Sequence, residues 1–313
     1  MEMGKAGMDL PKGSENMGLL PKDADILPPT DDRLFKALLI SPEAKPVLMD
    51  LISAIIGRSV IDVVVLNNEL PVSSTKEKNE RLDVNCKIDD GSQVDLEMQA
   101  SYIQELGSEH ENLKGKSIYY LCDLHASQDA RSKRYDELVQ TYQVTFCSYT
   151  VFPELPNYLN PFSMRHDATN VLLSDAIHVI YVELSKLGKV LKKPVDDMTD
   201  LEKWSVFLKY SNDRRYRKTV NSVIESKEAL QMASNLLMNI SQNERERAIF
   251  RSRKMYQTDE DSNRATLIAK GKEEKAFEIA REMLLDGEPV EKIIKYTRRT
   301  HEEVEDVKKQ LFQ

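Results

Sequence analysis

RLDVNCKIDDGSQVDLEMQ, residues 81–99, is the stretch of sequence around which the rest of the chain is arranged. Apolar and polar residues alternate on both sides of an Asp-Asp-Gly segment. The alternating apolar residues are Leu82, Val84, Cys86 and Ile88 before that segment, and Val94, Leu96 and Met98 after it. Alternation of this kind on both sides of a turn predicts two antiparallel strands with one apolar face.

The register of this hairpin follows from the numbering of its apolar residues, which are all even. Even positions must face even positions, because a slip of one residue would turn the carboxylates into the core. A three-residue loop at residues 89–91, with its glycine in the left-handed conformation, meets this condition. The resulting register pairs Val84 with Leu96 and Asp83 with Glu97.

Two acidic residues therefore meet on the polar face of the predicted hairpin. Directly opposed residues have Cβ atoms roughly 5 Å apart, so Asp83 and Glu97 would repel each other unless a cation lies between them or one is protonated. A hard divalent cation with oxygen ligands fits this position. Gln99 projects from the same face, one pleat further along. The alternative is an edge hairpin whose acids are only solvated, and the pattern alone leaves both interpretations open.

An Asp on one strand, a short turn and then Glu-x-Gln resembles the core of the PD-(D/E)XK nucleases, with Gln99 at the usual Lys position. Other segments, in this order, resemble the Rpn family of recombination-promoting nucleases and transposases. These segments are DDRLFKALL (31–39), KSIYYLCDLHASQ (116–128), IYVELSKL (180–187), LEKWSVFLKY (201–210) and the tail from residue 268 to residue 304. Together they cover most of the chain from residue 31 onward.

The resemblance implies an α/β fold and a metal-dependent DNA endonuclease. We expect a PD-(D/E)XK nuclease-like core with a mixed sheet flanked by helices at residues 30–190, and a helical C-terminal region at residues 191–313. Residues 1–29 are rich in Gly, Pro, Asp and Lys, which predicts a disordered leader. The implied reaction is Mg²⁺-assisted hydrolysis of a phosphodiester bond, with DNA as the partner.

The resemblance also assigns metal ligands. Asp83 and Glu97 would hold Mg²⁺, together with the backbone carbonyl of Met98. Asp32 matches the Asp of the family's D-x-x-F-K pattern and would complete the site from the first helical region. The other interpretation of Asp32 is a helix cap, because an Asp at a helix start accepts hydrogen bonds from free N–H groups and suits the helix dipole.

Gln99 and Lys116 complete the implied catalytic set. An amide has no basicity, so Gln99 is limited to orienting water or phosphate, whereas a Lys there would add a positive charge. Lys116 matches the basic residue before the family's Tyr-Tyr pair, and it shares a helix face with Tyr120, four residues on. Lys36 or Lys116 is the candidate for the missing cation. Gln128 is a weaker site candidate of the same kind.

Composition narrows the function further. The net charge of −8 and the pI of about 5.4 argue against a tight nucleic-acid coat protein, which needs a positive surface, but not against an enzyme. The basic segment at residues 214–218, which includes an aromatic, is the best candidate for contact with a nucleic-acid strand. The sequence contains no run of about 18 apolar residues, so it predicts no membrane span. The start of the chain also lacks the apolar region of a signal peptide. We therefore expect a cytoplasmic protein.

From Met198 onward the pattern is charged and helical. Thr199 and Glu202 form a capping box, and residues 264–285 read as a long helix. The last helix begins with acidic residues, which makes it a poor reader of the DNA major groove. Helical packing, or formation of a homo-oligomer through these C-terminal helices, is the expected role of the tail.

Two other functions fit the same residues. The first is a nuclease fold that binds nucleic acid without cutting it. The second is a helical protein-interaction module carried on an α/β scaffold. Metal-dependent nicking separates the enzyme from both alternatives, and salt-dependent DNA binding separates the first alternative from the second.

Overall fold

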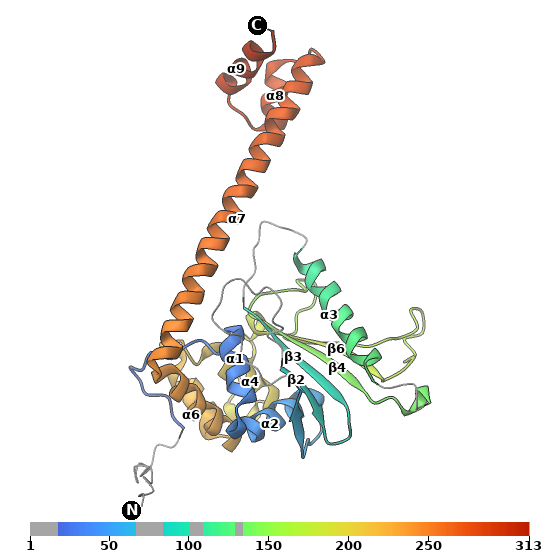
Figure 1. Cartoon of the computed structure of the whole chain (residues 1–313), viewed down its shortest axis with the longest axis vertical. Helices are drawn as coiled ribbons and strands as arrows, with labels where there is room; N and C mark the ends of the chain where they lie inside the picture. Colours follow the sequence, from blue (N-terminus) through green and yellow to red (C-terminus); the bar gives the residue numbers. More distant parts are fainter. Residues whose placement is uncertain (1–17, 67–83, 101–108, 129–133, 313) are drawn as a thin grey trace, which may run out of the picture. The chain divides into compact units, whose positions relative to one another are not determined.

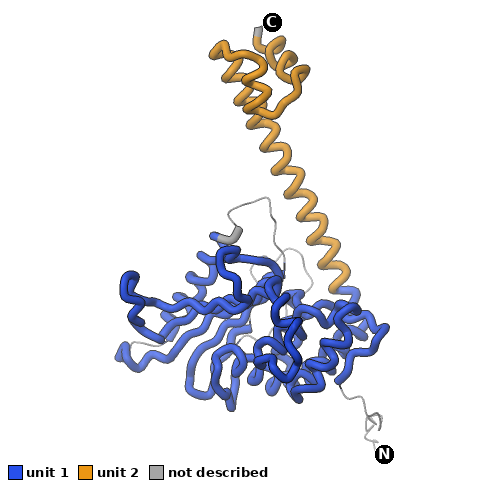
Figure 2. Tube along the Cα trace, turned by 180° about the vertical axis from the view of Figure 1, so that it is seen from behind, with its two compact units in different colours: residues 1–249 blue, residues 250–313 orange. Residues whose placement is uncertain are grey.

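The computed structural model describes residues 18–66, 84–100, 109–128 and 134–312 of the chain. It contains a twisted β-sheet with helices on both faces (Figure 1). The chain divides into two compact units, residues 1–249 and residues 250–313, which Figure 2 distinguishes by colour.

Six strands form one mixed sheet in the order β1-β2-β3-β4-β6-β5. Their bounds are β1 (Val63–Val65), β2 (Val84–Ile88), β3 (Gln93–Gln99), β4 (Thr141–Cys147), β5 (Leu159–Phe162) and β6 (Ile177–Glu183). Strands β1, β2 and β3 pair antiparallel, β3, β4 and β6 pair parallel, and β5 returns antiparallel to β6. The predicted α/β fold with a mixed sheet is confirmed, and β3 lies inside the sheet rather than at its edge.

The hairpin of β2 and β3 has the register that parity predicts. Val84 is opposite Leu96, as expected. The turn is closed by a hydrogen bond of 2.8 Å from the Gly91 amide to the Ile88 carbonyl, and Gly91 has a φ of +88°, in the left-handed region. The predicted partner of Glu97, Asp83, lies outside the described residues.

Several helix ends lie where local signals predict, but the long helix expected at residues 264–285 begins earlier, at Glu244. Their bounds are α1 (Asp32–Ile40), α2 (Lys45–Ile56), α3 (Glu109–Ala126), α4 (Asp200–Tyr210), α5 (Arg217–Glu225), α6 (Glu228–Gln242), α7 (Glu244–Leu285), α8 (Val290–Thr297) and α9 (His301–Phe312). The capping box of α4 is present, since Thr199 Oγ1 accepts from the Glu202 amide and the Glu202 carboxylate accepts from the Thr199 amide. Within the described ranges no helix is long and apolar enough to cross a bilayer.

The two faces of the sheet are covered by different helices. The even-numbered residues of β3 enter a large apolar core shared with α1, α2 and α4, where the ring centroids of Phe35 and Phe146 lie 5.6 Å apart. The odd-numbered residues face α3, which crosses β4 and β6 on the other side (Figure 1). Because both faces are covered, β3 is buried along most of its length.

The first compact unit extends beyond the boundary expected near residue 190. Helices α4, α5 and α6 contribute Trp204, Val220 and Leu237 to the same apolar core as the sheet, so the unit ends at Ile249. These helices are charged outside and apolar inside. The change after residue 190 from strand-like alternation to charged, helical spacing therefore marks the end of the strands, not the end of the compact unit.

Part of the predicted leader is also packed into this unit. Leu20 is buried, and its amide donates a hydrogen bond of 3.0 Å to Asn221 Oδ1 in α5. The amide of Leu27 donates over 3.0 Å to Ser241 Oγ in α6. Residues 18–29 are therefore not a disordered leader, because these contacts fasten them to α5 and α6.

The second unit contains most of α7, together with α8 and α9. Its small core consists of Ala280, Leu284, Ile293, Val304 and Val307. The predicted capping box at the start of α9 is present, since the Glu303 amide donates to Thr300 Oγ1 over 3.3 Å. Self-association through these helices stays a prediction.

Candidate functional site

Glu97 is the centre of the candidate site. It lies in the middle of the sheet, on the face that α3 covers, and only 4% of its surface is exposed. Its Oε1 accepts a hydrogen bond of 2.6 Å from Gln99 Nε2 and forms an ion pair with Lys116. Its Oε2 is buried and has no hydrogen-bond partner among the described residues. A buried carboxylate with one unpaired oxygen is unfavourable unless a ligand completes it.

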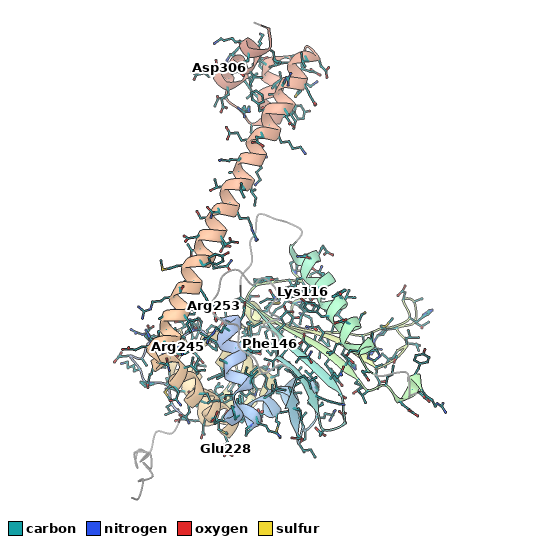
Figure 3. The ribbon with its side chains drawn as sticks, in the orientation of Figure 1. Lys116, Phe146, Glu228, Arg245, Arg253 and Asp306 are labelled. Atoms are coloured by element: carbon teal, nitrogen blue, oxygen red, sulfur yellow. The ribbon has the colours of Figure 1, made fainter. Side chains whose placement is uncertain are left out.

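Lys116 reaches Glu97 from α3, where Figure 3 labels it above the sheet. Its ammonium also lies 5.3 Å from the centroid of the Tyr120 ring, on the same helix face. About a third of the Lys116 side chain is exposed, so its charge is accessible beside a buried carboxylate. The sequence left Lys36 and Lys116 as candidates for the cation, and the structure brings Lys116 onto Glu97.

Gln99 acts on Glu97 itself. Its amide donates to Oε1, the oxygen that Lys116 also contacts. The two donors together hold one oxygen and leave the other free of hydrogen bonds from the described residues. Orientation of the carboxylate by the amide is therefore the role that the geometry supports for Gln99.

The remaining predicted ligands are located as follows. Asp32 is the first residue of α1, and the helix cap is its neighbour Asp31, whose carboxylate accepts from the Leu34 amide over 3.1 Å. Capping therefore does not account for Asp32, and its place in a metal site stays a prediction. Asp83 lies outside the described residues.

The direction of the Met98 carbonyl follows from the alternation of the strand. The carbonyl of its neighbour Gln99 accepts from the Ser148 amide, just beyond β4, over 2.9 Å. Successive carbonyls in a strand point to opposite sides, so the Met98 carbonyl points toward β2. The Met98 side chain itself is buried in the apolar core.

Sequence reasoning missed two buried polar residues beside Glu97. Asp95 is 5% exposed, and Gln143, its partner on β4, is fully buried with no hydrogen-bond partner for its amide atoms among the described residues. Both face α3. The sequence showed that Asp95, at an odd-numbered position, lies on the same face of the hairpin as Glu97. Its burial depends on α3 and could not be predicted from the hairpin alone.

Gln128 does not belong to the site. Its side-chain amide forms two hydrogen bonds of 2.9 Å with the backbone of Val139, donating to the carbonyl and accepting from the N–H. This pair of hydrogen bonds fastens the end of α3 to the segment before β4. The basic segment at residues 214–218 is also partly structural, because Arg217 is buried and donates to the Ser211 carbonyl over 2.6 Å.

Comparison with known proteins identifies the family. The family model for PD-(D/E)XK nuclease family transposases matches residues 29–266. This chain belongs to that family. The match includes every candidate site residue and supports a nuclease or transposase type of function. No curated protein and no solved structure matches the chain.

Proposed function

We propose that this member of the PD-(D/E)XK family is a metal-dependent endonuclease that hydrolyses DNA phosphodiester bonds. The proposed catalytic residues are Asp83, Glu97, Gln99 and Lys116. The observation that carries the proposal is the state of Glu97, a buried carboxylate with Lys116 on one oxygen and no partner among the described residues on the other. An arrangement that is unfavourable for folding alone is expected at a functional site.

The donor set fits Mg²⁺. Carboxylate and carbonyl oxygens are the ligands that hard divalent cations prefer, and Glu97 Oε2 is one such oxygen without a hydrogen bond from the described residues. The proposal continues the observed pairing of Val84 with Leu96 by one residue, which sets Asp83 opposite Glu97. Among the described residues, no group of three or more His, Cys, Asp or Glu side chains is placed to hold a metal ion, so the proposed set depends on Asp83.

The remaining proposed ligands are Asp32 and the Met98 carbonyl. When bound, the cation supplies a bound water of lowered pKa and stabilises the negative charge that develops on the phosphate.

The chain's own residues have distinct parts in this proposal. Lys116 supplies a fixed positive charge beside the carboxylate, where it attracts the phosphate and balances its charge. Gln99 fixes the rotation of the Glu97 carboxylate so that Oε2 stays available. Because an amide cannot take a proton at neutral pH, Gln99 does not act as a base. In this proposal the positive charge that the broader nuclease pattern has at the Gln99 position, on β3, is supplied by Lys116 on α3.

The proposal is tested with supercoiled plasmid, in Mg²⁺ and in EDTA, using the full chain and Asp83→Ala. We expect nicking by the wild type in Mg²⁺ only, and none by Asp83→Ala. Thermal melts run beside the assay should show stabilisation of the wild type by Mg²⁺, because a ligand bound by the native state alone stabilises it. The variant should lose most of that shift. Asp136→Ala is the control, since Asp136 is exposed and pairs with Arg134.

The outcomes separate the three functions. Undiminished nicking by Asp83→Ala would exclude the assigned site, and an equal Mg²⁺ shift in both proteins would exclude Asp83 as a ligand. No nicking, together with DNA binding that weakens as salt increases, would indicate a nuclease fold that only binds nucleic acid. The absence of both would favour a protein-interaction module.

A further inference from the structure

One rung of the sheet lies directly beneath α3 and includes Glu97. In the parallel register, Glu97 on β3 is the partner of Thr145 on β4, and Thr145 is the partner of Tyr181 on β6. All three are odd-numbered and lie on the α3 side of the sheet. Each is almost fully buried. The rung thus crosses the sheet from the proposed metal ligand to a tyrosine two strands away.

Two consecutive residues of α3 contact the two ends of this rung. Lys116 forms its ion pair with Glu97 at one end. The next residue, Ser117, accepts a hydrogen bond of 2.8 Å from the Tyr181 hydroxyl at the other end. Ser117 Oγ also lies 3.5 Å from Thr145 Oγ1. Neighbouring residues of a helix are separated by about 100° of rotation. A contact that fixes the rotation of α3 at Ser117 therefore also fixes the direction in which the Lys116 side chain projects.

The Tyr181 ring is itself held in place. Phe152 and Phe162 lie against it edge-on, with ring centroids 5.0 Å and 6.2 Å away. Burial raises the pKa of the Tyr181 hydroxyl to about 12, so the group stays protonated and donates its hydrogen bond across the useful pH range. The hydroxyl therefore presents one directional donor to α3 from a rigidly packed ring.

We propose that Tyr181 is a positioning residue, whose hydroxyl fixes α3 through Ser117 and so places the Lys116 ammonium on Glu97. Apolar packing alone would hold α3 against the sheet, but it is not directional. A hydrogen bond has a preferred length and angle, and it therefore selects one rotation and one height of the helix. The catalytic meaning of this placement rests on the proposed nuclease function, whereas the placement itself does not.

The first test measures the placement without any use of nuclease activity. Tyr181→Phe keeps the packed ring and removes only the hydroxyl. An amine-reactive acylating reagent is applied to the folded full chain, and modification of Lys116 is followed by mass spectrometry relative to Lys45 on α2, the helix that packs on the opposite face of the sheet. We expect Lys116 to react about threefold faster in the variant, because its ammonium leaves the ion pair with Glu97 more often.

Tyr142→Phe is the matched control for this measurement. The Tyr142 hydroxyl also donates a hydrogen bond within the sheet region, over 2.7 Å to Gln140 Oε1, but it belongs to the face away from α3. Its loss should leave the reactivity of Lys116 unchanged. Ser117→Ala removes the acceptor instead of the donor and should raise the reactivity of Lys116 as Tyr181→Phe does.

The second test is a double-mutant cycle on plasmid nicking. Tyr181→Phe should lower the nicking rate by about tenfold, which is less than the roughly 10²-fold that a 1 Å displacement can cause. In a Lys116→Ala background the same change should have no further effect, because the residue it positions is gone. A merely structural Tyr181 would lower the rate equally in both backgrounds.

The two tests separate the failure of this inference from the failure of the proposed function. Unchanged acylation of Lys116 in both Tyr181→Phe and Ser117→Ala would overturn the positioning role, and so would an equal loss of nicking in the Lys116→Ala background. A wild-type protein that does not nick would overturn the nuclease proposal, and the acylation rates would still decide whether Tyr181 places Lys116.

Discussion

The two faces of the central sheet differ in how far apolar packing alone holds them, since the α3 face has a small apolar cluster beside its polar groups. On one face the rung of Leu96, Val144 and Ile180 is entirely apolar and packs into the large core. The very next rung, on the other face, places a carboxylate, a hydroxyl and a phenol under α3. Apolar burial stabilises without regard to direction, whereas hydrogen bonds and ion pairs depend on geometry. We infer that the first face determines stability and the second determines the geometry of the site.

Glu97→Gln should have the largest effect, and mainly on activity. The substitution keeps the size of the side chain but removes the charge that Lys116 pairs with and that a metal requires. We expect nicking to fall by roughly 10³-fold. A urea titration on the same samples should show a change in unfolding free energy of no more than about 2 kcal/mol, because no cavity forms. Nicking within tenfold of wild type would remove Glu97 from the chemistry.

A pair of neighbouring substitutions on β4 sharpens the comparison between the faces. Val144→Ala removes buried methyl groups from the apolar core and should lower the unfolding free energy by about 2 kcal/mol. Thr145→Val keeps the shape of the residue and removes its hydroxyl, whose distance of 3.5 Å from Ser117 Oγ is long for a hydrogen bond. We therefore expect the unfolding free energy to fall by about 1 kcal/mol or less. Chemical denaturation midpoints measure both changes. Equal losses would mean that the two faces contribute to stability in the same way.

The smallest effect concerns the three cysteines, which report on both faces at once. Cys86 is buried on the apolar face and Cys147 on the polar face, while Cys122 is exposed on α3. Burial raises the pKa of the Cys86 and Cys147 thiols well above the ordinary value, so little reactive thiolate forms at pH 8. A thiol reagent should therefore modify one cysteine in the native protein and three after denaturation. Rapid modification of both Cys122 and Cys147 in the native protein, with Cys86 unmodified, would show that α3 does not cover the face of the sheet on which Cys147 lies.

Local signals predicted the hairpin and several helix ends correctly, but not the start of α7 at Glu244. The turn with Gly91 depends on backbone conformation within a few residues, and the capping box of Thr199 and Glu202 depends on hydrogen bonds within one helical turn. These features are properties of short segments and can be read without knowledge of the rest of the chain.

The extent of the first compact unit could not be read in this way. Helix α4 is charged on its outer side, but Trp204 and Leu208 are fully buried in the core of the sheet. An amphipathic stripe predicts that a helix covers something apolar, without identifying what it covers. The compact unit therefore extends past the boundary expected near residue 190, because α4 to α6 complete its core.

The sequence by itself determined that the hairpin has one apolar and one polar face, because parity assigns every side chain of a strand to a side. It also indicated the family, through segments whose order is visible without a fold. Only the tertiary structure decided that the polar face is buried and that Lys116 meets Glu97. That outcome depends on α3 being docked by residues distant in the chain, such as Tyr181, which lies 64 positions from Ser117. Contacts at such separations follow from how whole elements pack, and no local pattern specifies them.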